Sequence, residues 1–577
     1  MNNQQVAKTF SLLADMLDIE GTENKFAIIA YRRVAEQLAN LDRDVNAIAQ
    51  AGELRSIPGV GAAIAEKIDS LLSAGSFPLL DRLNAAIPAS VVELLSVPDM
   101  GPKRVKMLWE QASITSLAQL EAAAREGKLA GLPGVGKKLE EKIIVNIEAI
   151  KKRGASDRSP LGLAYPLAHA MLKRLMYVDG VLRASVAGSL RRMKETIGDI
   201  DLLAASEQVD PVMEAFTTLP QVAEVIARGP TKSSVRLHTG QQVDLRVIQP
   251  KHWGAALQYF TGSKDHNVRL REIALKQGFS LNEYSLTRVK DGKDVFCAEE
   301  AEVYDRLGLP FIPPELRENR GEFDRDIPRL IEVADLRGDL QMHSTWSDGQ
   351  TTIEEMARAA KARGYEYILI TDHSQSLGVA NGLTPERLRQ QRKEIDAVNA
   401  KGLGIRVLQG TEVEIKADGS LDYPDDVLAS LDIVLASLHT SLRQEHDRVT
   451  QRALSAIRNP HVDIFAHPTG RLNFEAGDPA KARAGADLDM EAIFAACAET
   501  GTLIELNASP ERLDLNDLHA RRALDVGCTL VISTDSHHPS MLGNIHYGVA
   551  MARRAWATPD RVANTWPLDR LLARFAG

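Results

Sequence analysis

Six apolar segments in the C-terminal part of the chain contain or lead into a histidine or a carboxylate. The segment LQMHS reaches His343, YILITDHS contains His373, and VDIFAHP contains His467. Helical patterns such as residues 352–364 separate several of these segments, and alternating strands and helices are typical of a parallel sheet or barrel. Because parallel barrels place functional residues at the carboxyl ends of their strands, these side chains are candidate metal ligands.

The candidate ligands are five histidines, two aspartates and one glutamate: His343, Asp348, His373, Glu412, His439, His467, Asp535 and His537. One such histidine alone would more often be a structural residue, so the prediction rests on repetition at corresponding strand ends. A mixed set of imidazoles and carboxylates suits Zn²⁺, Mn²⁺ or Fe²⁺ better than Mg²⁺. Eight side chains exceed the needs of one tetrahedral ion, which predicts a cluster of two or three ions.

The stretch GDLQMHSTWSDG, residues 338–349, departs from a simple ligand pattern at Gln341. This residue lies two positions before His343, where a second histidine would form a ligand pair. Its amide oxygen can bind a cation, but it is neutral and is a weaker ligand for Zn²⁺ than imidazole. We therefore expect a working but modified site, with Gln341 as a further candidate ligand, one ion held less tightly, and activity that depends on added Mn²⁺.

Three aspartates on two predicted strands form a second candidate metal site. Asp199 and Asp201 belong to the strand pattern DIDLLAA, in which alternation places both on one face. Asp244 lies in another strand pattern, QQVDLRVIQ. Three carboxylates on one sheet face can hold two Mg²⁺ or Mn²⁺ ions together with the phosphates of a nucleotide. The preceding GSLRR supplies a close-approach glycine, a hydroxyl and two guanidinium groups that suit phosphate oxygens.

A repeated turn in the N-terminal third predicts contacts with DNA. The segments LRSIPGVGAAIAEKIDSLL (54–72) and LAGLPGVGKKLEEKIIVNI (129–147) resemble each other, and LLSVPDMGPKRVKMLW (94–109) is a weaker copy. Each copy places a tight turn before an amphipathic helix, whose free N–H groups can bind an anion. A packing corner between helices would explain one copy, but the repetition favours the helix-hairpin-helix motif, which grips the sugar-phosphate backbone. The candidate DNA contacts are the turn glycines Gly59, Gly61, Gly101, Gly134 and Gly136.

Length, charge and composition limit the class of protein. At 577 residues the chain is too long for one core, and 44% hydrophobic and 25% charged residues are ordinary for a globular protein. Residues 1–320 carry 41 Lys and Arg against 40 Asp and Glu, whereas the remainder carries 28 against 38 and holds 10 of the 14 histidines. This acidic, histidine-rich part favours metal binding over nucleic-acid binding. The sequence predicts a cytoplasmic protein without a membrane segment, and three widely spaced cysteines indicate neither disulfides nor a thiolate zinc site.

The segment YFTGSKDHNVRLREIALKQGFSLNEYSL (259–286), together with the GS and DID motifs before it, resembles the family X DNA polymerases of the nucleotidyltransferase superfamily. The resemblance covers residues 1–320. It implies that Asp199 and Asp201 bind both metal ions, while Asp244 binds the catalytic ion and deprotonates the primer 3′-hydroxyl. It also implies a nucleotide site, to which Gly188 belongs, in which Ser189 and Arg192 hold the triphosphate. In that site Tyr259, Phe260 and Gly262 line the sugar, Asn267 contacts the base edge, and Arg271 contacts the template side.

Two departures from the animal members of this family concern particular residues. Lys67 corresponds to their lyase lysine, but Ala27 and Ala63 stand where that 5′-phosphate pocket has other lysines. This leaves open whether Lys67 supports lyase activity, contacts phosphate or is simply exposed. Gln242 stands where the animal enzyme has an arginine beside the third carboxylate.

Residues 336–577, on the ligand-bearing segments above, resemble the PHP (polymerase and histidinol phosphatase) domain, which bacterial and archaeal family X polymerases carry. The resemblance implies a phosphoesterase with 3′–5′ exonuclease activity, in which the eight candidate ligands hold two or three Zn²⁺ or Mn²⁺ ions. The first motif of the family is often His-x-His, and Gln341 departs from it.

The predicted fold is multidomain, α+β and α/β, with helical helix-hairpin-helix domains, a nucleotidyltransferase palm with a mixed β-sheet, and a distorted (β/α) barrel of PHP type. We predict an N-terminal DNA-binding domain (1–85), a fingers-like domain (86–153) and the palm (154–250). A thumb-like domain (251–320), a linker (321–335) and the PHP domain (336–577) follow.

The predicted function is DNA-directed gap filling in DNA repair, including base excision repair, combined with 3′–5′ exonuclease activity. The expected partners are gapped or primer–template DNA and deoxynucleoside triphosphates, and the expected state is a monomer. Two alternatives stay open. In the first, the PHP domain is structural and catalytically impaired. In the second, the chain is a template-independent nucleotidyltransferase.

Overall fold

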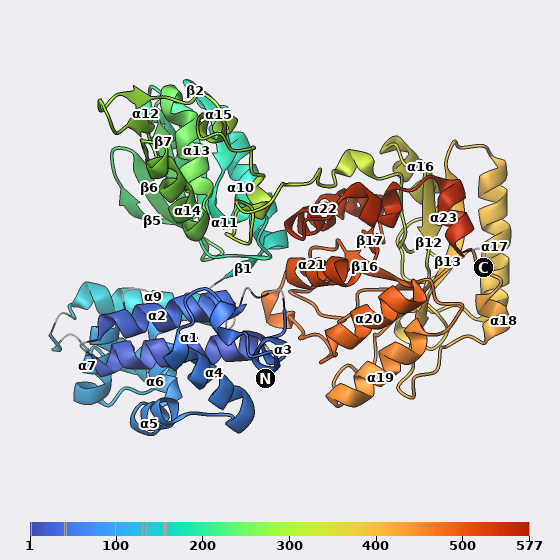
Figure 1. Ribbon diagram of the computed structural model, residues 1–577, viewed down its shortest axis with the longest axis horizontal. Helices are drawn as coiled ribbons and strands as arrows, with labels where there is room; N and C mark the ends of the chain where they lie inside the picture. The colour runs from blue at the N-terminus through green and yellow to red at the C-terminus, as the bar shows by residue number, and fades with distance from the viewer. Residues whose placement is uncertain are drawn as a thin grey trace. The chain divides into compact units, whose positions relative to one another are not determined.

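The chain folds into two compact units, Met1–Asp157 and Arg158–Gly577 (Figure 1). The structure is a computed structural model, and it describes residues 1–575 apart from 2, 23, 40, 42, 98, 99, 130, 134 and 154–157. Among the described residues, no helix combines the length and the apolar character that a membrane crossing requires.

The described part of the first unit is helical. Its helices are α1 (Asn3–Glu20), α2 (Lys25–Ala39), α3 (Val45–Gln50), α4 (Ala62–Ala74), α5 (Pro78–Ala86), α6 (Ala89–Glu93), α7 (Pro102–Ala112), α8 (Leu117–Arg125) and α9 (Lys137–Arg153). Apolar side chains three and four residues apart, such as Phe10, Leu13 and Leu17 on α1, face a single core. The repeated turns lie where the sequence predicts them, because α4, α7 and α9 each begin directly after the last glycine of a copy.

A five-stranded mixed sheet begins the second unit. Its strands are β2 (Val181–Val186), β4 (Ile200–Ser206), β5 (Val222–Arg228), β6 (Lys232–Leu237) and β7 (Gln242–Ile248), in the order β2-β4-β7-β6-β5. Strands β4 and β7 are parallel, and the other neighbours are antiparallel. Helices α10 (Leu161–Leu175) and α12 (Val209–Thr217) pack against this sheet.

Alternation along β4 separates the two faces of this sheet. Leu202 and Ala204 join the core with α10 and α12, whereas Leu203 and Ala205 pack with Trp253 of α13 (Trp253–Thr261). Since every second residue shares a face, Asp201 lies on the α13 side. After α13 come α14 (Lys264–Lys276), α15 (Glu300–Arg306) and a small antiparallel sheet of β8 (Phe279–Leu281), β9 (Leu286–Arg288) and β10 (Asp294–Val295).

The C-terminal part is a parallel seven-stranded barrel. The strands follow in chain order: β11 (Gly338–Asp339), β12 (Tyr367–Ile370), β13 (Arg406–Glu414), β14 (Ile433–Ser437), β15 (Ile464–Phe465), β16 (Leu503–Asn507) and β17 (Leu530–Ser533). A parallel bridge between Met342 and Ser536 joins the segments that follow the first and last strands, and the His343 N–H donates to the Ser536 carbonyl at 2.9 Å. This nearly closed barrel confirms the predicted fold class.

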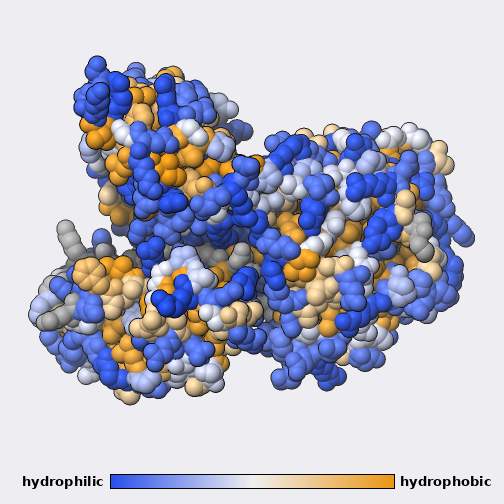
Figure 2. All heavy atoms as spheres, viewed as in Figure 1, coloured by the Kyte–Doolittle hydropathy of each residue, from blue (hydrophilic) through white to orange (hydrophobic). Residues whose placement is uncertain are grey.

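Helices surround the barrel and close one end of it. They are α16 (Ile353–Ala362), α17 (Pro385–Ala400), α18 (Asp425–Leu428), α19 (His446–Ile457), α20 (Met490–Thr500), α21 (Asp517–Val526), α22 (Ile545–Arg554) and α23 (Leu568–Phe575). On β12, Tyr367 and Leu369 pack inside with Trp566, whereas Ile368 and Ile370 join the core shared with the outer helices. Figure 2 shows hydrophilic residues over most of the visible surface of this part, as expected when the apolar strands are enclosed.

A buried ion-pair cluster ties the helices after the mixed sheet to the loop that follows β2. The Glu300 carboxylate accepts hydrogen bonds from Arg191 at 2.7 and 2.8 Å and from Arg317, whose side chain is fully buried. Burial alone would raise the pKa of Glu300, but Arg317 and Arg191 outweigh it and lower the pKa to about 2. The Glu300 carboxylate therefore stabilises the fold above its ordinary pKa of 4.5, and this stabilisation is lost as the pH falls towards 2.

We predict that Glu300→Gln lowers the free energy of unfolding of the second unit at pH 7 by about 3 kcal/mol, because two guanidinium groups lose a buried counter-charge. Urea denaturation followed by tryptophan fluorescence measures the change. Glu302→Gln, a substitution of a half-buried residue on the same helix, is the control. Equal stability of the two variants would contradict the prediction.

Candidate metal centres

Three aspartates meet on the α13 face of the mixed sheet, and we call this group the carboxylate site: Asp199, Asp201 and Asp244. Asp201 and Asp244 are direct partners in the register of the parallel strands β4 and β7, and Asp199 lies just before β4. Burial, followed by the charges of Asp244 and Asp199, raises the pKa of Asp201 to about 6. Burial and Asp244 also raise the pKa of Asp199. Carboxylates this strongly coupled are well suited to a divalent cation.

Two side chains contact Asp244: Lys232, which no sequence motif indicated, and Gln242. Lys232, on the neighbouring strand β6, forms an ion pair with Asp244 Oδ2, and Gln242 Nε2 donates to Oδ1 at 3.1 Å. Gln242 thus contacts the third carboxylate from the position where the resemblance would have an arginine. Among the described residues, the three aspartates are not one of the groups whose ligand atoms all lie within 4.8 Å of one another. The ion pair between Lys232 and Asp244 is consistent with this separation of the three carboxylates.

The turn after β2 brings the predicted phosphate-binding residues beside the carboxylate site. Gly188 has φ of +56°, and a Cβ built on it would lie 2.1 Å from Asp201 Oδ2, so only glycine fits there. Ser189 follows in the short helix α11 (Gly188–Arg191). Arg192 donates from Nη1 to the Thr261 carbonyl at 2.6 Å and from Nε to Glu318 at 3.1 Å.

The other predicted nucleotide residues gather around the end of α13. Asn267 Nδ2 donates to the Tyr259 carbonyl at 2.7 Å, and Arg246 lies over the Phe260 ring. Gly262 ends α13 with φ of +68°. Arg271 is exposed and donates to the Asn267 carbonyl at 3.3 Å. The structure thus brings this set together beside the carboxylate site, while the role of each residue stays a prediction.

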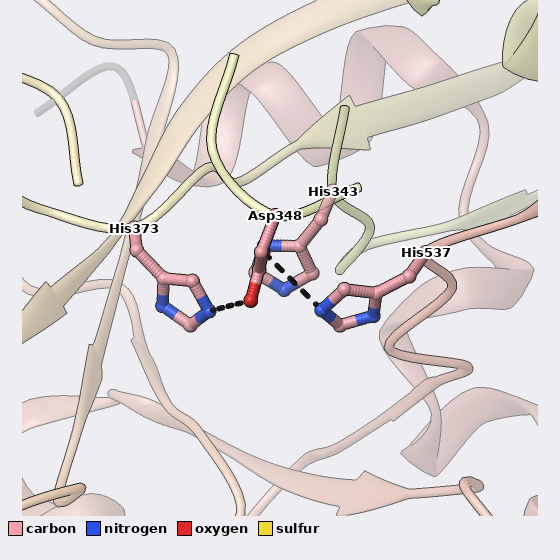
Figure 3. Close-up of side chains that lie close together, drawn as sticks. All are labelled: His343, Asp348, His373 and His537. Atoms are coloured by element: carbon pink, nitrogen blue, oxygen red, sulfur yellow. Dashed lines mark ion pairs between the residues drawn. The ribbon is translucent and has the colours of Figure 1, made fainter. Parts of the chain in front are cut away.

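The eight candidate ligands of the barrel lie together, and we call them the histidine cluster: His343, Asp348, His373, Glu412, His439, His467, Asp535 and His537. Three groups within it have ligand atoms within 4.8 Å of one another. In the first group, His343, His373 and His537 converge on Asp348 (Figure 3). The Nε2 atoms of His373 and His537 each lie 3.4 Å from an Asp348 oxygen.

Glu412 joins the other two groups, because its carboxylate lies among four histidines. Oε1 is 2.5 Å from His467 Nε2 and 3.1 Å from His439 Nε2. Oε2 is 3.3 Å from His373 Nδ1 and 3.4 Å from His343 Nε2, and His343 Nε2 is also 3.1 Å from Asp535 Oδ1. A carboxylate whose two oxygens face different imidazoles can bridge two ions.

Charge inside the histidine cluster is strongly coupled. Burial alone would raise the pKa of Glu412, but His439, His373 and His467 outweigh it and hold that pKa well below the usual range. Burial alone would lower the pKa of His439, but Glu412 and Glu414 raise it to about 9. In the same way, Asp348 and Asp535 overcome the effect of burial and raise the pKa of His537 to about 9.

The donor set fits divalent transition metals. Both nitrogens of His343 and the Nδ1 atoms of His373 and His467 are buried and have no hydrogen-bond partner among the described residues. Buried imidazole nitrogens are normally paired, and a bound cation would satisfy them. Each of the three ligand groups described above could therefore hold one ion.

Gln341 has the same property as these imidazoles. Its side chain is fully buried, and neither Oε1 nor Nε2 has a hydrogen-bond partner among the described residues. Its backbone carbonyl accepts from the Asp535 N–H at 3.1 Å, which ties this segment to a ligand of the cluster. An unpaired buried amide is unfavourable by about 1–3 kcal/mol, so a ligand for Gln341 is expected on energetic grounds.

Two residues near the cluster were missed from the sequence. Glu414, on the same face of β13 as Glu412, accepts from His439 Nδ1 at 2.9 Å and so orients that ring. The alternation in the segment EVE was the signal that could have revealed it. Arg512 lies 3.4 Å from Asp535 Oδ2 and has a buried Nη1 without a partner among the described residues. No sequence pattern indicated that Arg512 would lie beside the cluster.

In the first unit, the last glycine of each repeated turn lies at a helix N-terminus. Gly61 and Gly101 are the residues that cap α4 and α7, and Gly136 lies directly before α9. Gly59 has φ of +85°. Gly134 lies outside the described residues. Lys67 donates to the Ala63 carbonyl of its own helix at 3.0 Å.

Family models match four parts of the chain: a helix-hairpin-helix domain over residues 1–77, a SAM-like helix-hairpin-helix tandem over 91–149, a DNA polymerase beta thumb over 256–318, and a PHP domain over 339–509. A curated relative in Bacillus subtilis (strain 168), named DNA polymerase/3′-5′ exonuclease PolX, is 39% identical over 569 residues, which are 98% of this chain and 97% of that protein. The chain belongs to the PolX family. These are family X DNA polymerases with a C-terminal PHP domain, as the sequence motifs predicted.

Two further relatives match separate parts of the chain. DNA polymerase lambda of Rattus norvegicus is 24% identical over 345 residues, 55% of this chain and 56% of that protein. A protein of Thermoanaerobacter sp. (strain X514), whose name gives it as a probable phosphatase, is 31% identical over 226 residues, 37% of this chain and 84% of that protein. The PHP match, residues 339–509, covers six of the eight residues of the histidine cluster in this PolX family member, whereas Asp535 and His537 follow it in the sequence.

We predict that Gly188→Ala reduces primer extension by about a hundredfold, because an added Cβ would displace the Asp201 carboxylate, and shifts of about 1 Å have effects of that size. Rates of single-nucleotide addition measure the effect. Gly278→Ala is a matched control, since Gly278 also has a positive φ, +81°, but no neighbour within 4 Å of its Cβ position. Similar rates for both variants would mean that backbone strain, and not the contact with Asp201, sets the effect.

We predict that Gln341→His tightens Zn²⁺ binding by about tenfold or more, since even residues around metal ligands change affinity by about 10–100-fold. Metal content of the purified protein and Zn²⁺ titration against a chelator provide the measurement. The control is Gln409→His, at a buried glutamine that donates to the Leu388 carbonyl instead. Unchanged metal content in Gln341→His would refute the expectation that this position weakens one ion.

Proposed function

We propose that the chain fills short gaps in DNA by templated addition of deoxynucleotides and trims 3′ ends by 3′–5′ exonuclease activity. The observation that carries the proposal is the presence of a carboxylate site and a histidine cluster on a chain that matches a named polymerase/exonuclease almost end to end. Helix-hairpin-helix turns in the first unit support binding of the DNA backbone.

In the polymerase reaction, the three aspartates would hold two divalent ions, Mg²⁺ or Mn²⁺. The chemistry these ions would supply is an offset to the charge of the phosphates. Asp244 takes the proton of the primer 3′-hydroxyl, which requires that it leave Lys232. Ser189 and Arg192 bind the triphosphate, and the turn that ends at Gly262 lines the sugar. Asn267 contacts the edge of the base, and Arg271 contacts the template side.

In the exonuclease reaction, the histidine cluster would hold two or three Zn²⁺ or Mn²⁺ ions, and the chemistry these ions would supply is Lewis-acid stabilisation of a phosphodiester. Glu414 keeps His439 in one orientation. The guanidinium of Arg512, beside Asp535 and with an unpaired Nη1 among the described contacts, binds a non-bridging phosphate oxygen. The substrates are gapped or primer–template DNA and deoxynucleoside triphosphates, and the chain acts as a monomer.

We predict that Asp199→Ala abolishes primer extension and leaves 3′–5′ degradation intact, whereas His343→Ala and Asp535→Ala have the opposite effects. Each substitution removes a ligand from only one of the two sites. Extension and degradation of the same labelled primer, in Mg²⁺ and in Mn²⁺, separate the activities.

Three outcomes would contradict this assignment. Retained extension in Asp199→Ala would refute the role of the carboxylate site. Absent degradation in the unmodified protein with Mn²⁺ would favour a structural PHP domain. Extension that ignores the template sequence would favour a template-independent nucleotidyltransferase.

A further inference from the structure

An arginine of the barrel reaches the nucleotide-binding side of the second unit. Arg554, the last residue of α22, is almost completely buried, and its Nε and Nη2 donate to Asp517 at 3.0 and 2.8 Å. Its Nη1 donates outside the barrel, to Glu318 Oε1 at 3.2 Å and to the Arg192 carbonyl at 2.7 Å. One planar guanidinium therefore joins an acid of the barrel to two residues of the polymerase core.

Glu318 connects this arginine to the side chain of Arg192. The same Oε1 atom that accepts from Arg554 accepts from Arg192 Nε at 3.1 Å and lies 4.0 Å from Lys194 Nζ. Burial alone would raise the pKa of Glu318, but Lys194, Arg192 and Arg554 outweigh it and hold the pKa far below its ordinary value. Glu318 is thus a buried anion shared among three cations.

The side chain of Arg192 is held on two sides. Nε is fixed by Glu318 and Nη1 by the Thr261 carbonyl, while no described residue accepts a hydrogen bond from Nη2. The Arg192 N–H donates to the Gly188 carbonyl at 3.3 Å, and the Cβ position of Gly188 lies 2.1 Å from Asp201 Oδ2, so Arg192 belongs to the turn that borders the carboxylate site. The guanidinium is therefore presented, with one edge available, beside the place proposed for the triphosphate.

We propose that Arg554 of the PHP domain is a positioning residue for the polymerase reaction, which holds Arg192 in the orientation that binds the triphosphate. This inference rests on the proposed role of Arg192 in nucleotide binding. Arg554 acts in two ways: it shares the charge of Glu318, and it fixes the backbone carbonyl of Arg192.

The charge of Glu318 explains why the loss of Arg554 would change the affinity for the nucleotide. Without Arg554, the buried Glu318 carboxylate loses one of its ion-pair partners and no longer holds the Arg192 side chain in the same position. At the same time, the loop at Arg192 loses its backbone anchor. Both changes lower the affinity for a triphosphate without altering the carboxylates, so they act on KM more than on kcat.

The test is steady-state kinetics of gap filling by the full chain with Arg554→Met. We expect KM for the deoxynucleoside triphosphate to rise about tenfold, equivalent to about 1.4 kcal/mol. The KM for gapped DNA and the rate of 3′–5′ degradation should stay within about twofold, since the histidine cluster is untouched. Arg554→Lys, which keeps the charge but not the planar fork, should restore part of the affinity.

Arg553→Met is the matched control, because Arg553 also joins the barrel to this region, but through Glu315 at 2.7 Å and the Ile331 carbonyl. It should leave the KM for the triphosphate unchanged. Glu318→Gln tests the same link if Arg554→Met does not fold, and it should also raise this KM. A fall in the KM for the triphosphate in Glu318→Gln would overturn the proposal, because it would show that Glu318 competes with the triphosphate for Arg192.

Arg192→Met distinguishes a failure of the inference from a failure of the proposed nucleotide site. A raised KM in Arg192→Met with an unchanged KM in Arg554→Met would refute only the positioning role. An unchanged KM in Arg192→Met would refute the proposed nucleotide role and the inference with it. If both single variants raise KM, the double variant should match Arg192→Met, and additive effects would show that Arg554 acts elsewhere.

Discussion

Buried carboxylates can remain ionised only beside positive charge, and this constraint shapes every functional region of the second unit. In the histidine cluster, Glu412 lies among four imidazoles, and in the carboxylate site Lys232 partners Asp244. Between the two, Glu318 is shared by Arg192, Arg554 and Lys194. Desolvation makes an unpaired buried charge strongly unfavourable, so these acids require their partners, or metal ions, to be tolerated.

The two catalytic scaffolds gather their acids by different backbone geometries. In the mixed sheet, alternation places Asp199 and Asp201 on one face, and the parallel register of β4 and β7 sets Asp244 opposite Asp201. In the barrel, ligands from separate strands converge because parallel strands end at the same rim. The barrel therefore gathers side chains around a rim, whereas the sheet sets its carboxylates on one face.

The contacts of Arg554 and Arg553 also bear on how the two activities can coexist in one chain. These side chains donate to Glu318 and Glu315, which lie at the end of the part that matches the DNA polymerase beta thumb. A second ion pair joins Arg471 of the barrel to Glu195 of the polymerase core at 2.7 Å. These pairs are largely buried and join the barrel to the polymerase core within the second unit.

The sequence by itself determined which residues are candidate ligands and the periodicity that groups them. Strand alternation, strand-end histidines and glycines before helices are consequences of local backbone geometry, so motifs such as DID, PGVG and YILITDH could be read directly, and the family match agrees with them. Only the tertiary structure decided that Lys232 pairs with Asp244, that Glu414 orients His439 and that Arg554 reaches Glu318. Arg554 and Glu318 are 236 residues apart, and no local pattern encodes which buried charge will face which once the elements pack.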